Sequence, residues 1–365
     1  MNSEGPICID LFAGAGGLSY GLSQAGFSVA LGVDIDKDAT TTLKNNFKNM
    51  KVVNSDIRCL DPEEVISEAG FGVNEIDIAA GGPPCQGFSK SNTRTRSMKN
   101  PLNHLYKEFF KFVKLLNPSV FILENVAGLK SFKKCAVLTD MLNTAANIGY
   151  HPQWAILDAA DFGVPQRRKR IFIIGTKHKV ENIFPKPTKN FVTVREAISD
   201  LPVLENGNHE DKMRYSKYSD LSEYQKIMRE SNGTSVSNNF VTKNTDLVME
   251  RYKHIPQGGN WKNIPDDLMR NYTDKSRCHG GIYRRLWWDE PSVVIANFRK
   301  NMLIHPEQHR GLSVREAARL QSFPDHYIFY GSQISQQQQA ANAVPPILAE
   351  TIGKKIFNEM ENIFL

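Results

Sequence analysis

The sequence predicts an α/β protein with a doubly wound, mainly parallel sheet and a second, smaller and irregular domain. Three observations support this. Short apolar runs alternate with segments of helical periodicity over the first half of the chain. Polar or glycine-rich residues follow directly after several of these apolar runs. From about residue 177 to residue 310 the apolar pieces become short and are separated by Asn, Gly, Ser and Lys.

Each expected element has a local reason. Apolar, β-branched runs bounded by turn residues predict strands, and apolar residues at helical spacing predict helices. The expected strands are PICIDLFAG (6–14), FSVALGVD (27–34), IDIAAGG (76–82), VFILENV (120–126) and RIFIIGT (170–176). The expected helices are GLSYGLSQAG (17–26), KDATTTLKNNF (37–47), HLYKEFFKFVKLLNP (104–118), VREAARLQSF (314–323) and ILAETIGKKIFNEMENIF (347–364). The run SQQQQAAN (335–342) is interpreted as a brief polar patch.

Composition narrows the function classes. No apolar run approaches the roughly 20 residues that span a bilayer, and the N-terminus lacks a secretory signal pattern, so we expect a cytoplasmic protein without a membrane partner. The five cysteines are an odd number without a C-x-x-C pair, which predicts reduced thiols and no metal site. A net charge of +6 favours a polyanionic partner.

A glycine turn marks the first candidate site. DLFAGAGGLSYG places Gly14, Gly16 and Gly17 between a strand and a helix, where backbone can approach a ligand. Asp34 ends the next strand at the offset from which an acid reaches ribose hydroxyls, and Asp56 ends another strand. The glycine spacing does not fit a dinucleotide fingerprint, so it favours a nucleoside site without a pyrophosphate. The alternative is a tight turn without a ligand.

A second candidate site centres on GGPPCQGFS (81–89). Pro83 and Pro84 hold the strand tip rigid and present Cys85 at the carboxyl end of the sheet, where open α/β sheets keep their ligands. Glu124 follows four apolar residues, so partial desolvation is expected to raise its pKa and let it carry a proton. The basic segment QRRKR (166–170) has two interpretations: it binds an anion or a carbonyl group of a ligand, or it is a solvated basic turn. The alternatives for Cys85 and Glu124 are a buried inert thiol and a capping or ion-paired glutamate.

These motifs, in this order, resemble the DNA cytosine carbon-5 methyltransferases of bacterial restriction-modification systems. The resemblance rests on DLFAGAGG, GVDID, GGPPCQGFS, ENV, QRRKR, RGLSVREAARLQSFP and AANAVPP and covers nearly the whole chain. It implies the Rossmann-like fold of S-adenosylmethionine-dependent methyltransferases, with residues 1–182 as catalytic and cofactor-binding domain, completed by 326–365. Residues 183–325 are then the target-recognition domain and hinge.

The resemblance also implies S-adenosyl-L-methionine as donor, with S-adenosyl-L-homocysteine as product, and a flipped cytosine in a specific duplex DNA sequence as acceptor. Cys85 is the implied nucleophile at carbon 6, Glu124 contacts ring nitrogen 3 and the exocyclic amine, Arg168 contacts the ring carbonyl, and Arg170 supports them. The implied cofactor residues are Phe12, Ala13, Gly14, Gly16, Gly17, Asp34, Ile35, Asp56, Ile57, Pro83, Leu105, Asn342 and Val344. Ala341 stands where the family usually has glycine.

Two segments are expected to meet DNA. QGFSKSNTRTRSMKNPLN (86–103) is basic, without an acid or apolar periodicity, and is expected to be a lid that is mobile without DNA. RCHGGIYRRLWW (277–288) suits groove contacts, although Trp287 and Trp288 could equally form a small core with solvated arginines. The candidate DNA contacts are Ser89, Lys90, Arg94, Arg96, Lys99, Arg284 and Arg285.

Two other functions stay open. A tRNA-directed cytosine-5 methyltransferase of the same fold is one, although some 130 residues between IIGT and RGLS leave room for a DNA-recognition region. A catalytically idle DNA-binding regulator is the other. For the preferred function the expected partners are double-stranded DNA and a cognate restriction endonuclease that acts separately on the same site, and the protein is expected to be a monomer that protects host DNA.

Overall fold

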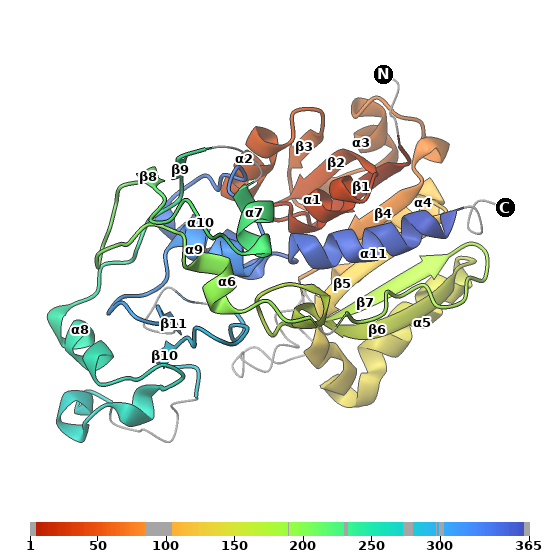
Figure 1. Cartoon of the computed structure of the whole chain (residues 1–365). Coiled ribbons are helices and arrows are strands. Elements are labelled where there is room, and N and C mark those ends of the chain that lie inside the picture. The colour runs from red at the N-terminus through yellow and green to blue at the C-terminus, as the bar shows by residue number, and fades with distance from the viewer. Residues whose placement is uncertain are drawn as a thin grey trace. The chain divides into compact units, whose positions relative to one another are not determined.

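The computed structural model describes residues 5–84, 104–188, 190–229, 233–272, 280–296, 298 and 303–360. The chain forms two compact units (Figure 1). Unit 1 comprises Met1–Ala159, Lys169–Thr188 and Val344–Leu365, and unit 2 comprises Ala160–Arg168 and Lys189–Ala343. The division at 188/189 lies close to the expected boundary at 182/183. Residues 160–168 and 326–343, expected in the catalytic domain, cluster with unit 2.

Unit 1 is built on a seven-stranded sheet of order β3-β2-β1-β4-β5-β7-β6. Every neighbouring pair is parallel except those of β7, which runs antiparallel to β5 and β6. This confirms the predicted doubly wound, mainly parallel sheet. The strands are β1 (Ile7–Leu11), β2 (Ser28–Asp34), β3 (Lys51–Asn54), β4 (Ile78–Gly81), β5 (Val120–Val126), β6 (His151–Asp158) and β7 (Lys169–Thr176).

Helices cover both faces of this sheet (Figure 1). One layer contains α1 and α11, which pack on each other, and the other contains α3, α4 and α5 in succession. A Cβ built on Gly21 would lie 2.4 Å from the Ala349 Cβ, so α1 needs glycine at this crossing. The helices of unit 1 are α1 (Gly17–Gln24), α2 (Lys37–Asn46), α3 (Pro62–Glu68), α4 (Tyr106–Leu116), α5 (Ala136–Asn147) and α11 (Pro346–Asn358), with 3-10 turns η1 (Ile57–Cys59), η2 (Val73–Glu75) and η4 (Ala127–Cys135).

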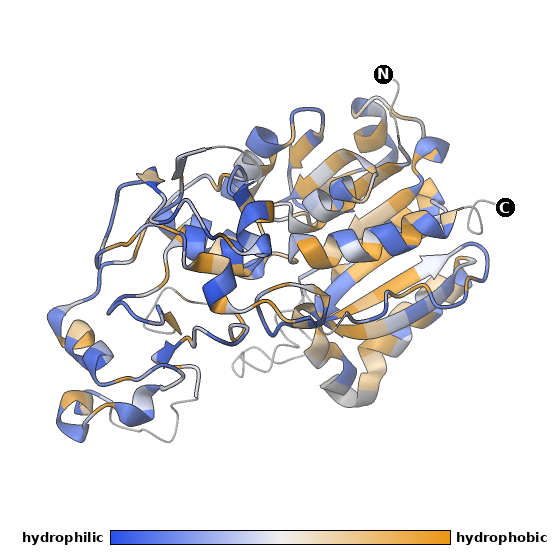
Figure 2. Cartoon of the chain, viewed as in Figure 1, coloured by the Kyte–Doolittle hydropathy of each residue, from blue (hydrophilic) through white to orange (hydrophobic). Residues whose placement is uncertain are grey.

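The core of unit 1 is apolar. The strands of the large sheet are mostly orange in Figure 2, as expected for parallel strands buried on both faces. Phe121 on β5 lies at its centre and packs edge-to-face against Phe109, Phe110 and Tyr150, with ring centroids 5.2–6.1 Å apart. Gly175 on β7 lies opposite Phe121, and a Cβ there would come within 2.1 Å of the phenylalanine ring.

Unit 2 has short elements and long connections, in keeping with the loss of periodicity after residue 177. Its apolar cluster around α8 includes Val248, Tyr252, Ile264 and Ile304. The helices are α6 (Val194–Ile198), α7 (Glu223–Arg229), α8 (Asp246–Lys253), α9 (Val314–Leu320) and α10 (Gln333–Asn342), with 3-10 turns η6 (Trp261–Asn263) and η7 (Asp266–Met269). The strands are β8 (Met213–Arg214), β9 (Ser235–Val236), β10 (Arg284–Arg285) and β11 (Leu303–Ile304); the 3-10 turn η5 (Ala159–Phe162) begins at the boundary of the two units.

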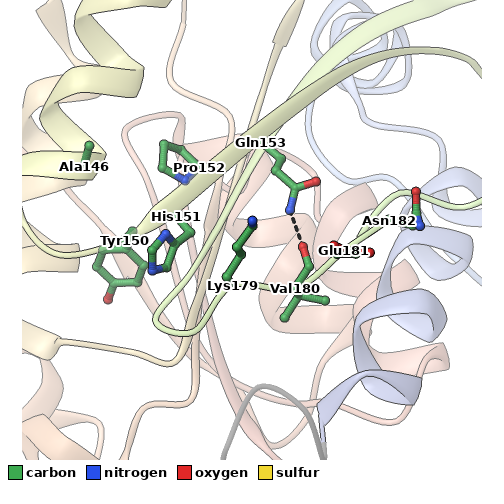
Figure 3. Close-up of a pocket in the computed structure, with 9 residues that line it drawn as sticks. All are labelled: Ala146, Tyr150, His151, Pro152, Gln153, Lys179, Val180, Glu181 and Asn182. Carbon is green, nitrogen blue, oxygen red and sulfur yellow. Dashed lines mark hydrogen bonds between the residues drawn. The ribbon is translucent and has the colours of Figure 1, made fainter.

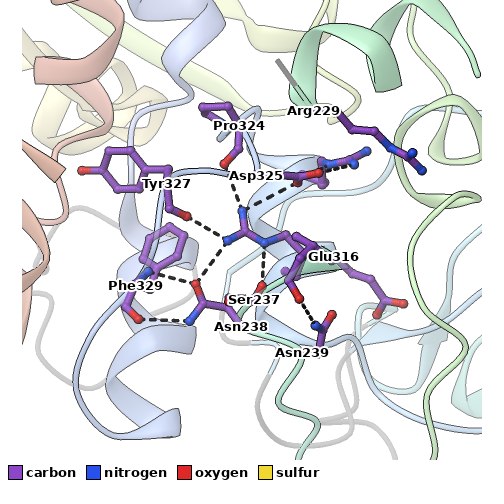
Figure 4. Close-up of polar contacts among 12 residues, drawn as sticks. Arg229, Ser237, Asn238, Asn239, Glu316, Pro324, Asp325, Tyr327 and Phe329 are labelled. Carbon is purple, nitrogen blue, oxygen red and sulfur yellow. Dashed lines mark hydrogen bonds and ion pairs between the residues drawn. The ribbon is translucent and has the colours of Figure 1, made fainter. Parts of the chain in front are cut away.

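Buried arginines link the loops of unit 2. Arg315 on α9 donates to the carbonyls of Ser237, Pro324 and Tyr327 and to Asn238 Oδ1 (Figure 4). Its guanidinium replaces the ladder hydrogen bonds that these irregular segments lack, since a planar group with five donors can satisfy several carbonyls at once.

Arg319, one turn further along α9, is fully buried between two carboxylates. It contacts both oxygens of Asp325 at 2.6 Å and both oxygens of Asp200 at 3.1–3.2 Å. Arg229 also lies 2.7 Å from Asp200, so this carboxylate pairs with two arginines, Arg229 and Arg319.

One interpretation from the sequence is wrong. The run SQQQQAAN is not a polar patch but part of helix α10, where Gln336, Gln337 and Gln339 are buried. Their amides are satisfied internally, for example Gln339 Nε2 by the Tyr330 carbonyl at 2.8 Å. In the part of the chain that the structure describes, no helix is long and apolar enough to cross a membrane.

Candidate active site

The candidate residues of unit 1 gather at the carboxyl edge of the sheet. In the strand register Leu11 pairs with Val33 and Gly81, and Gly81 pairs with Leu123, so β1, β2, β4 and β5 end side by side. The residues that follow these strands therefore share one edge, where ligands bind in open α/β sheets.

The glycine turn after β1 has the predicted unusual backbone. Phe12, Gly14 and Gly16 have φ angles of 65°, 54° and 82°, in the left-handed region. A Cβ built on Gly14 would meet no atom within 4 Å, so the turn faces open space. Ala13, Gly16 and Gly17 are buried, which leaves Phe12 and Gly14 partly accessible.

Asp34 links the ends of β1 and β2. Its Oδ2 accepts the Gly14 N–H and its Oδ1 accepts the Asp36 N–H, both at 2.8 Å. Burial raises the pKa of Asp34, while the N–H donors from Asp36 and Gly14 act in the opposite direction. A carboxylate has about four acceptor positions, so two backbone donors leave room for hydroxyl groups.

An apolar side chain follows Asp34. Ile35 is 67% exposed and can offer an apolar contact to an aromatic ring. Asn54 Nδ2, at the end of β3, donates to the carbonyls of Asp34 at 3.1 Å and Ile35 at 3.0 Å. Asn54 was not predicted from the sequence, because a lone polar residue after a strand carries no distinctive pattern.

The other expected cofactor residues of unit 1 differ in accessibility. Asp56 is half-buried and holds Arg58 through both carboxylate oxygens, and this hydrogen-bonded partner lowers the pKa of Asp56. Ile57, Leu105 and Val344 are buried, with exposed fractions of 5–8%. Asp56 is thus the accessible member of this group.

The tip of β4 lies beside the glutamate of β5. A Cβ built on Gly82 would lie 3.2 Å from Glu124 Oε2, so the glycine leaves this carboxyl room close to the backbone. Asn125 Nδ2, buried beside it, donates to the Pro83 carbonyl at 3.2 Å and fixes the first proline of the tip. Cys85 lies outside the described residues.

Glu124 forms an ion pair with Arg170, which was expected from the sequence only to support the other catalytic residues. Arg170 Nε lies 2.8 Å from Glu124 Oε1, and both side chains are largely buried, with 15% and 13% of their surface exposed. The register of β5 and β7 explains this pair. Arg170 lies opposite Val126, and Glu124 is two residues before Val126, so its side chain is on the same face of the sheet as the Arg170 side chain.

Arg168 lies in different surroundings from those expected. Its side chain is 1% exposed, and it donates to the carbonyls of Ile295, Ala341 and Asn342. The expectation that Arg168 contacts a ring carbonyl is therefore wrong for this structure, since its guanidinium serves main-chain carbonyls of unit 2.

The remaining expected cofactor residue, Asn342, is the last residue of α10 and is exposed. Its Oδ1 accepts from Gln338 Nε2 at 2.6 Å. Ala341 before it is 4% exposed.

Asp10 is a buried acid that sequence reasoning missed. It is fully buried on β1, and Ser19 Oγ donates to its Oδ2 at 2.6 Å. Its Oδ1 has no hydrogen-bond partner among the described residues. Burial raises the pKa of Asp10 to about 7, opposed by Ser19 and reinforced by the charges of Asp34 and Glu124. The sequence did contain a signal for this residue, because Asp10 is an acidic residue within an otherwise apolar strand.

The two arginines expected to bind DNA do not behave alike. Arg285 is 2% exposed and donates to the carbonyls of Tyr252, Ile255, His305 and Gln308, so its expected role as a DNA contact is wrong. Arg284 is half-buried and donates to the Gly258 carbonyl.

The neighbouring tryptophans also differ. Trp288 is buried against His305, while Trp287 is 46% exposed. The other expected DNA contacts, Ser89, Lys90, Arg94, Arg96 and Lys99, lie outside the described residues.

A cleft of about 560 Å³ opens elsewhere in unit 1 (Figure 3). It is lined by residues around the start of β6, among them His151, Gln153 and Lys179, and by Val180, whose carbonyl accepts from Gln153 Nε2 at 2.6 Å. The start of β6 is at the amino edge of the sheet, because β6 runs parallel to β5, so this cleft is separate from the candidate site. Among the described residues, no three His, Cys, Asp or Glu side chains gather as metal ligands would.

Comparison with known proteins gives consistent matches. Residues 7–358 match the family model of the C-5 cytosine-specific DNA methylases. The chain is 36% identical to the Type II methyltransferase M.DdeI of Desulfomicrobium norvegicum, over 98% of this chain and 90% of that protein. It is 35% identical to M1.HphI of Haemophilus parahaemolyticus, over 97% and 87%. Among solved structures, a protein described as a DNA modification methyltransferase encoded within an E. coli prophage superposes with a TM-score of 0.80 at 28% identity, covering 98% and 99% of the two chains.

Proposed function

This chain belongs to the C-5 cytosine-specific DNA methylase family and is a DNA cytosine-5-methyltransferase of the Type II restriction-modification kind, and on that basis we propose that it methylates a flipped cytosine through a covalent adduct of Cys85. The observation that carries the proposal is the position of Glu124 beside Gly82, in an ion pair with Arg170, at the carboxyl edge of the sheet. The sequence places Cys85 three residues beyond Gly82.

The chemistry requires a nucleophile because carbon 5 of cytosine is too weakly nucleophilic to take a methyl group directly. The Cys85 thiolate forms a bond to carbon 6, and the displaced electron pair makes carbon 5 enamine-like. The electron pair at carbon 5 then takes the methyl group, whose former bonding pair stays with the sulfur of the donor. A base removes the proton from carbon 5, the pair of that C–H bond re-forms the double bond between carbons 5 and 6, and the pair of the sulfur–carbon 6 bond leaves with Cys85 as the thiolate.

Glu124 and Arg170 stabilise the charge that develops on the ring. We assign Glu124 to ring nitrogen 3 and the exocyclic amine, where a proton or hydrogen bond given by its carboxyl group to nitrogen 3 offsets the negative charge that forms on the ring with the adduct. We transfer the contact with the ring carbonyl from Arg168 to Arg170, because Arg170 lies 2.8 Å from Glu124 and Arg168 serves main-chain carbonyls. A guanidinium beside the glutamate can meet an adjacent carbonyl with its remaining N–H groups.

Methyltransferases of this family use S-adenosylmethionine, which supplies an electrophilic methyl group on a sulfonium. The described residues fit its nucleoside part. Gly14 leaves the turn open, Asp34 has acceptor positions for ribose hydroxyls, and the exposed Ile35 offers an apolar surface for adenine. Asp56 is assigned to the adenine edge, and it must exchange part of its Arg58 contact to bind there.

Duplex DNA is the substrate that this activity implies. A base stacked in a duplex cannot enter an active site, so the cytosine must leave the helix, at a cost of a few kcal/mol. We assign recognition of the DNA sequence to unit 2 and a protective role against a cognate restriction endonuclease to the methylation, as the Type II relatives suggest. We propose that the protein acts as a monomer in the cytoplasm.

The test is a methylation assay with radiolabelled S-adenosylmethionine on duplex DNA and on tRNA, followed by sequencing of the DNA for 5-methylcytosine. We expect label in DNA alone, at carbon 5 of cytosine within one short sequence. Label in tRNA alone would replace this function with the tRNA-directed one, and label in neither would leave a DNA-binding regulator.

A further inference from the structure

Resting on the proposed function, we propose that Asp10 couples binding of the methyl donor to the release of a proton, so that the site favours the sulfonium donor over its uncharged thioether product. The mechanism given above assigns no role to Asp10. This residue lies within unit 1, on β1, between the strands that carry Asp34 and Glu124.

The Asp10 side chain is buried with one oxygen unpaired. Ser19 Oγ donates to Oδ2 at 2.6 Å, and Oδ1 has no hydrogen-bond partner among the described residues. A carboxylate here would lack the donors that its second oxygen needs, so burial favours the acid form. Burial accordingly raises the pKa of Asp10 to about 7, although the Ser19 hydrogen bond opposes this, and the residue holds a proton near neutral pH.

Two further acids add to this effect. The negative charges of Asp34, at the end of β2, and of Glu124, on β5, both raise the pKa of Asp10. Arg170 is paired with Glu124 at 2.8 Å, and Cys8, the other titratable residue of β1, is buried as a thiol of raised pKa. Asp10 therefore lies in a negative field that a bound cation would reverse.

The other elements on this face bring no unpaired charge to Asp10. Helix α1 (GLSYGLSQ) contributes the Ser19 hydroxyl and has Tyr20 as its titratable residue, and β4 (IAAG) has none. Helix α11 packs on α1, and its Lys354 and Lys355 are each paired with a glutamate four residues away in the chain. The charge that is missing near Asp10 is a positive one.

The order of the strands brings such a charge to Asp10. The ribose of the donor is assigned to Asp34 on β2 and its methyl group is delivered beside Glu124 on β5, while the sheet runs β2-β1-β4-β5. Neighbouring strands are about 4.8 Å apart, so a donor that joins these two residues has to cross the ends of β1 and β4. Asp10 is the second-last residue of β1.

A cation beside an acid lowers the pKa of that acid. When the donor binds, the O–H bond of Asp10 therefore breaks, its proton passes to solvent, and the carboxylate that remains stabilises the sulfonium. The product has a neutral thioether in place of the sulfonium and draws no such response. Below pH 7 donor binding has to displace the proton, whereas above pH 7 Asp10 is already ionised. Affinity for the donor should thus rise with pH through 7, while affinity for the product stays nearly level.

The test is calorimetric titration with S-adenosylmethionine and with S-adenosylhomocysteine, in two buffers of different ionisation enthalpy, which gives the number of protons exchanged. At pH 7 we expect release of roughly half a proton more with the donor than with the product, because a group with a pKa of about 7 is half protonated there. The ratio of donor to product affinity should rise about fivefold from pH 6 to pH 8. Asp10→Asn should lose both effects, since an amide does not ionise.

Controls assign the proton to Asp10. The α-amino group of the ligand, with a pKa of about 8, titrates equally with both proteins, so the difference between wild type and Asp10→Asn excludes it. Asp61→Asn keeps the cap of helix α3 at an exposed site and should release protons as wild type does. Ser19→Ala removes a hydrogen bond that lowers the pKa of Asp10, so it should move the release to higher pH, and it serves as the test if Asp10→Asn does not fold.

The outcomes separate the inference from the function on which it rests. Equal proton release in wild type and Asp10→Asn, or with donor and product, would overturn the coupling and leave the methyltransferase function standing. Release at an unchanged pH in Ser19→Ala contradicts it as well. Wild-type protein that binds no donor or methylates no DNA would overturn the proposed function itself.

Discussion

The two units of this protein are stabilised in different ways. Unit 1 has a large apolar core around a seven-stranded sheet, and its described buried charged group is Asp10. Unit 2 has short strands and long loops, and all the buried arginines among the described residues lie in it: Arg168, Arg229, Arg251, Arg285, Arg310, Arg315 and Arg319. Their partners are mostly loop carbonyls and a few carboxylates.

This difference shows how an irregular region can keep one conformation. A sheet satisfies its backbone by ladder hydrogen bonds and leaves side chains free to pack, whereas loops leave carbonyls that need donors. Arginine provides five donors on one side chain, so a few residues can link many loop carbonyls. The loops between these links are then free to differ in sequence, which suits the role in selecting a DNA target that we propose for unit 2.

Exchange of the region around α8 should have the largest effect. Replacing residues 246–304 with the matching part of a relative of different specificity is expected to move methylation entirely to that relative's DNA site. The wider exchange of residues 183–305 would remove Asp200, Arg229 and Asn238, the partners of α9, and is expected to yield unstable protein. Sequencing for 5-methylcytosine reads the result, and methylation still at the original site in the narrow chimera would place recognition elsewhere.

Loss of a buried arginine should be the next largest effect. Arg319→Met leaves Asp200 and Asp325 without their main cation and is expected to cost about 3–5 kcal/mol in the free energy of unfolding. Arg195→Met is the control, because its pair with Asp289 is exposed to solvent and should contribute little to stability. Urea unfolding measures both, and hydrogen exchange should show the loss first in unit 2. Equal losses for the two variants would show that burial of the pair does not matter.

The buried acids of the two units should respond to pH in opposite directions. Asp10 has a folded pKa of about 7, above its unfolded value of 3.8, so it stabilises the fold fully below about pH 4, and this contribution is lost as pH rises toward 7. Burial alone would raise the pKa of Glu316, but Arg310 holds it at about 2, below 4.5, so its contribution is lost as pH falls from about 4.5 to 2. Acid should therefore unfold unit 2 first.

Asp10→Asn isolates the first of these effects. The amide mimics the protonated acid and can still accept from Ser19, so the variant should lose the fall in stability between about pH 4 and pH 7 and exceed wild type by on the order of 4 kcal/mol at pH 8. Thermal unfolding at several pH values provides the measurement. A variant with the same pH profile as wild type would mean that another group is responsible.

Asp34→Ala should have the smallest of these effects, which we measure on ligand binding. Removing the acceptor for ribose hydroxyls is expected to weaken cofactor binding by about 1–3 kcal/mol with little change in DNA affinity. Asp36→Ala is the matched control, since Asp36 caps helix α2 and its loss should lower stability without lowering cofactor affinity. Unchanged calorimetric affinity in Asp34→Ala would remove this residue from the cofactor site.

The same contrast explains what could be predicted from the sequence. The sheet of unit 1 was predictable because apolar strands and helical periodicity are local patterns, and Asp34 could be placed at a strand end from its spacing. The contacts of Arg168 and Arg285 could not, because a basic residue in a loop looks the same whether it faces solvent or a distant carbonyl. The burial of three glutamines in α10 could not be predicted for the same reason, because the sequence does not show whether a polar side chain has its hydrogen-bond partners inside the fold. These are Gln336, Gln337 and Gln339.

Covalent trapping tests the central claim most directly. Wild-type protein should form an adduct that survives denaturation with duplex DNA carrying 5-fluorocytosine at the methylated position, because fluorine cannot leave as a proton. Peptide mass spectrometry should locate the adduct at Cys85. Cys85→Ser should form none and methylate no DNA, since an alcohol is scarcely ionised at neutral pH, while keeping the unfolding profile of wild type. The same adduct in Cys85→Ser, or none in wild type at a cytosine that it methylates, would contradict the account.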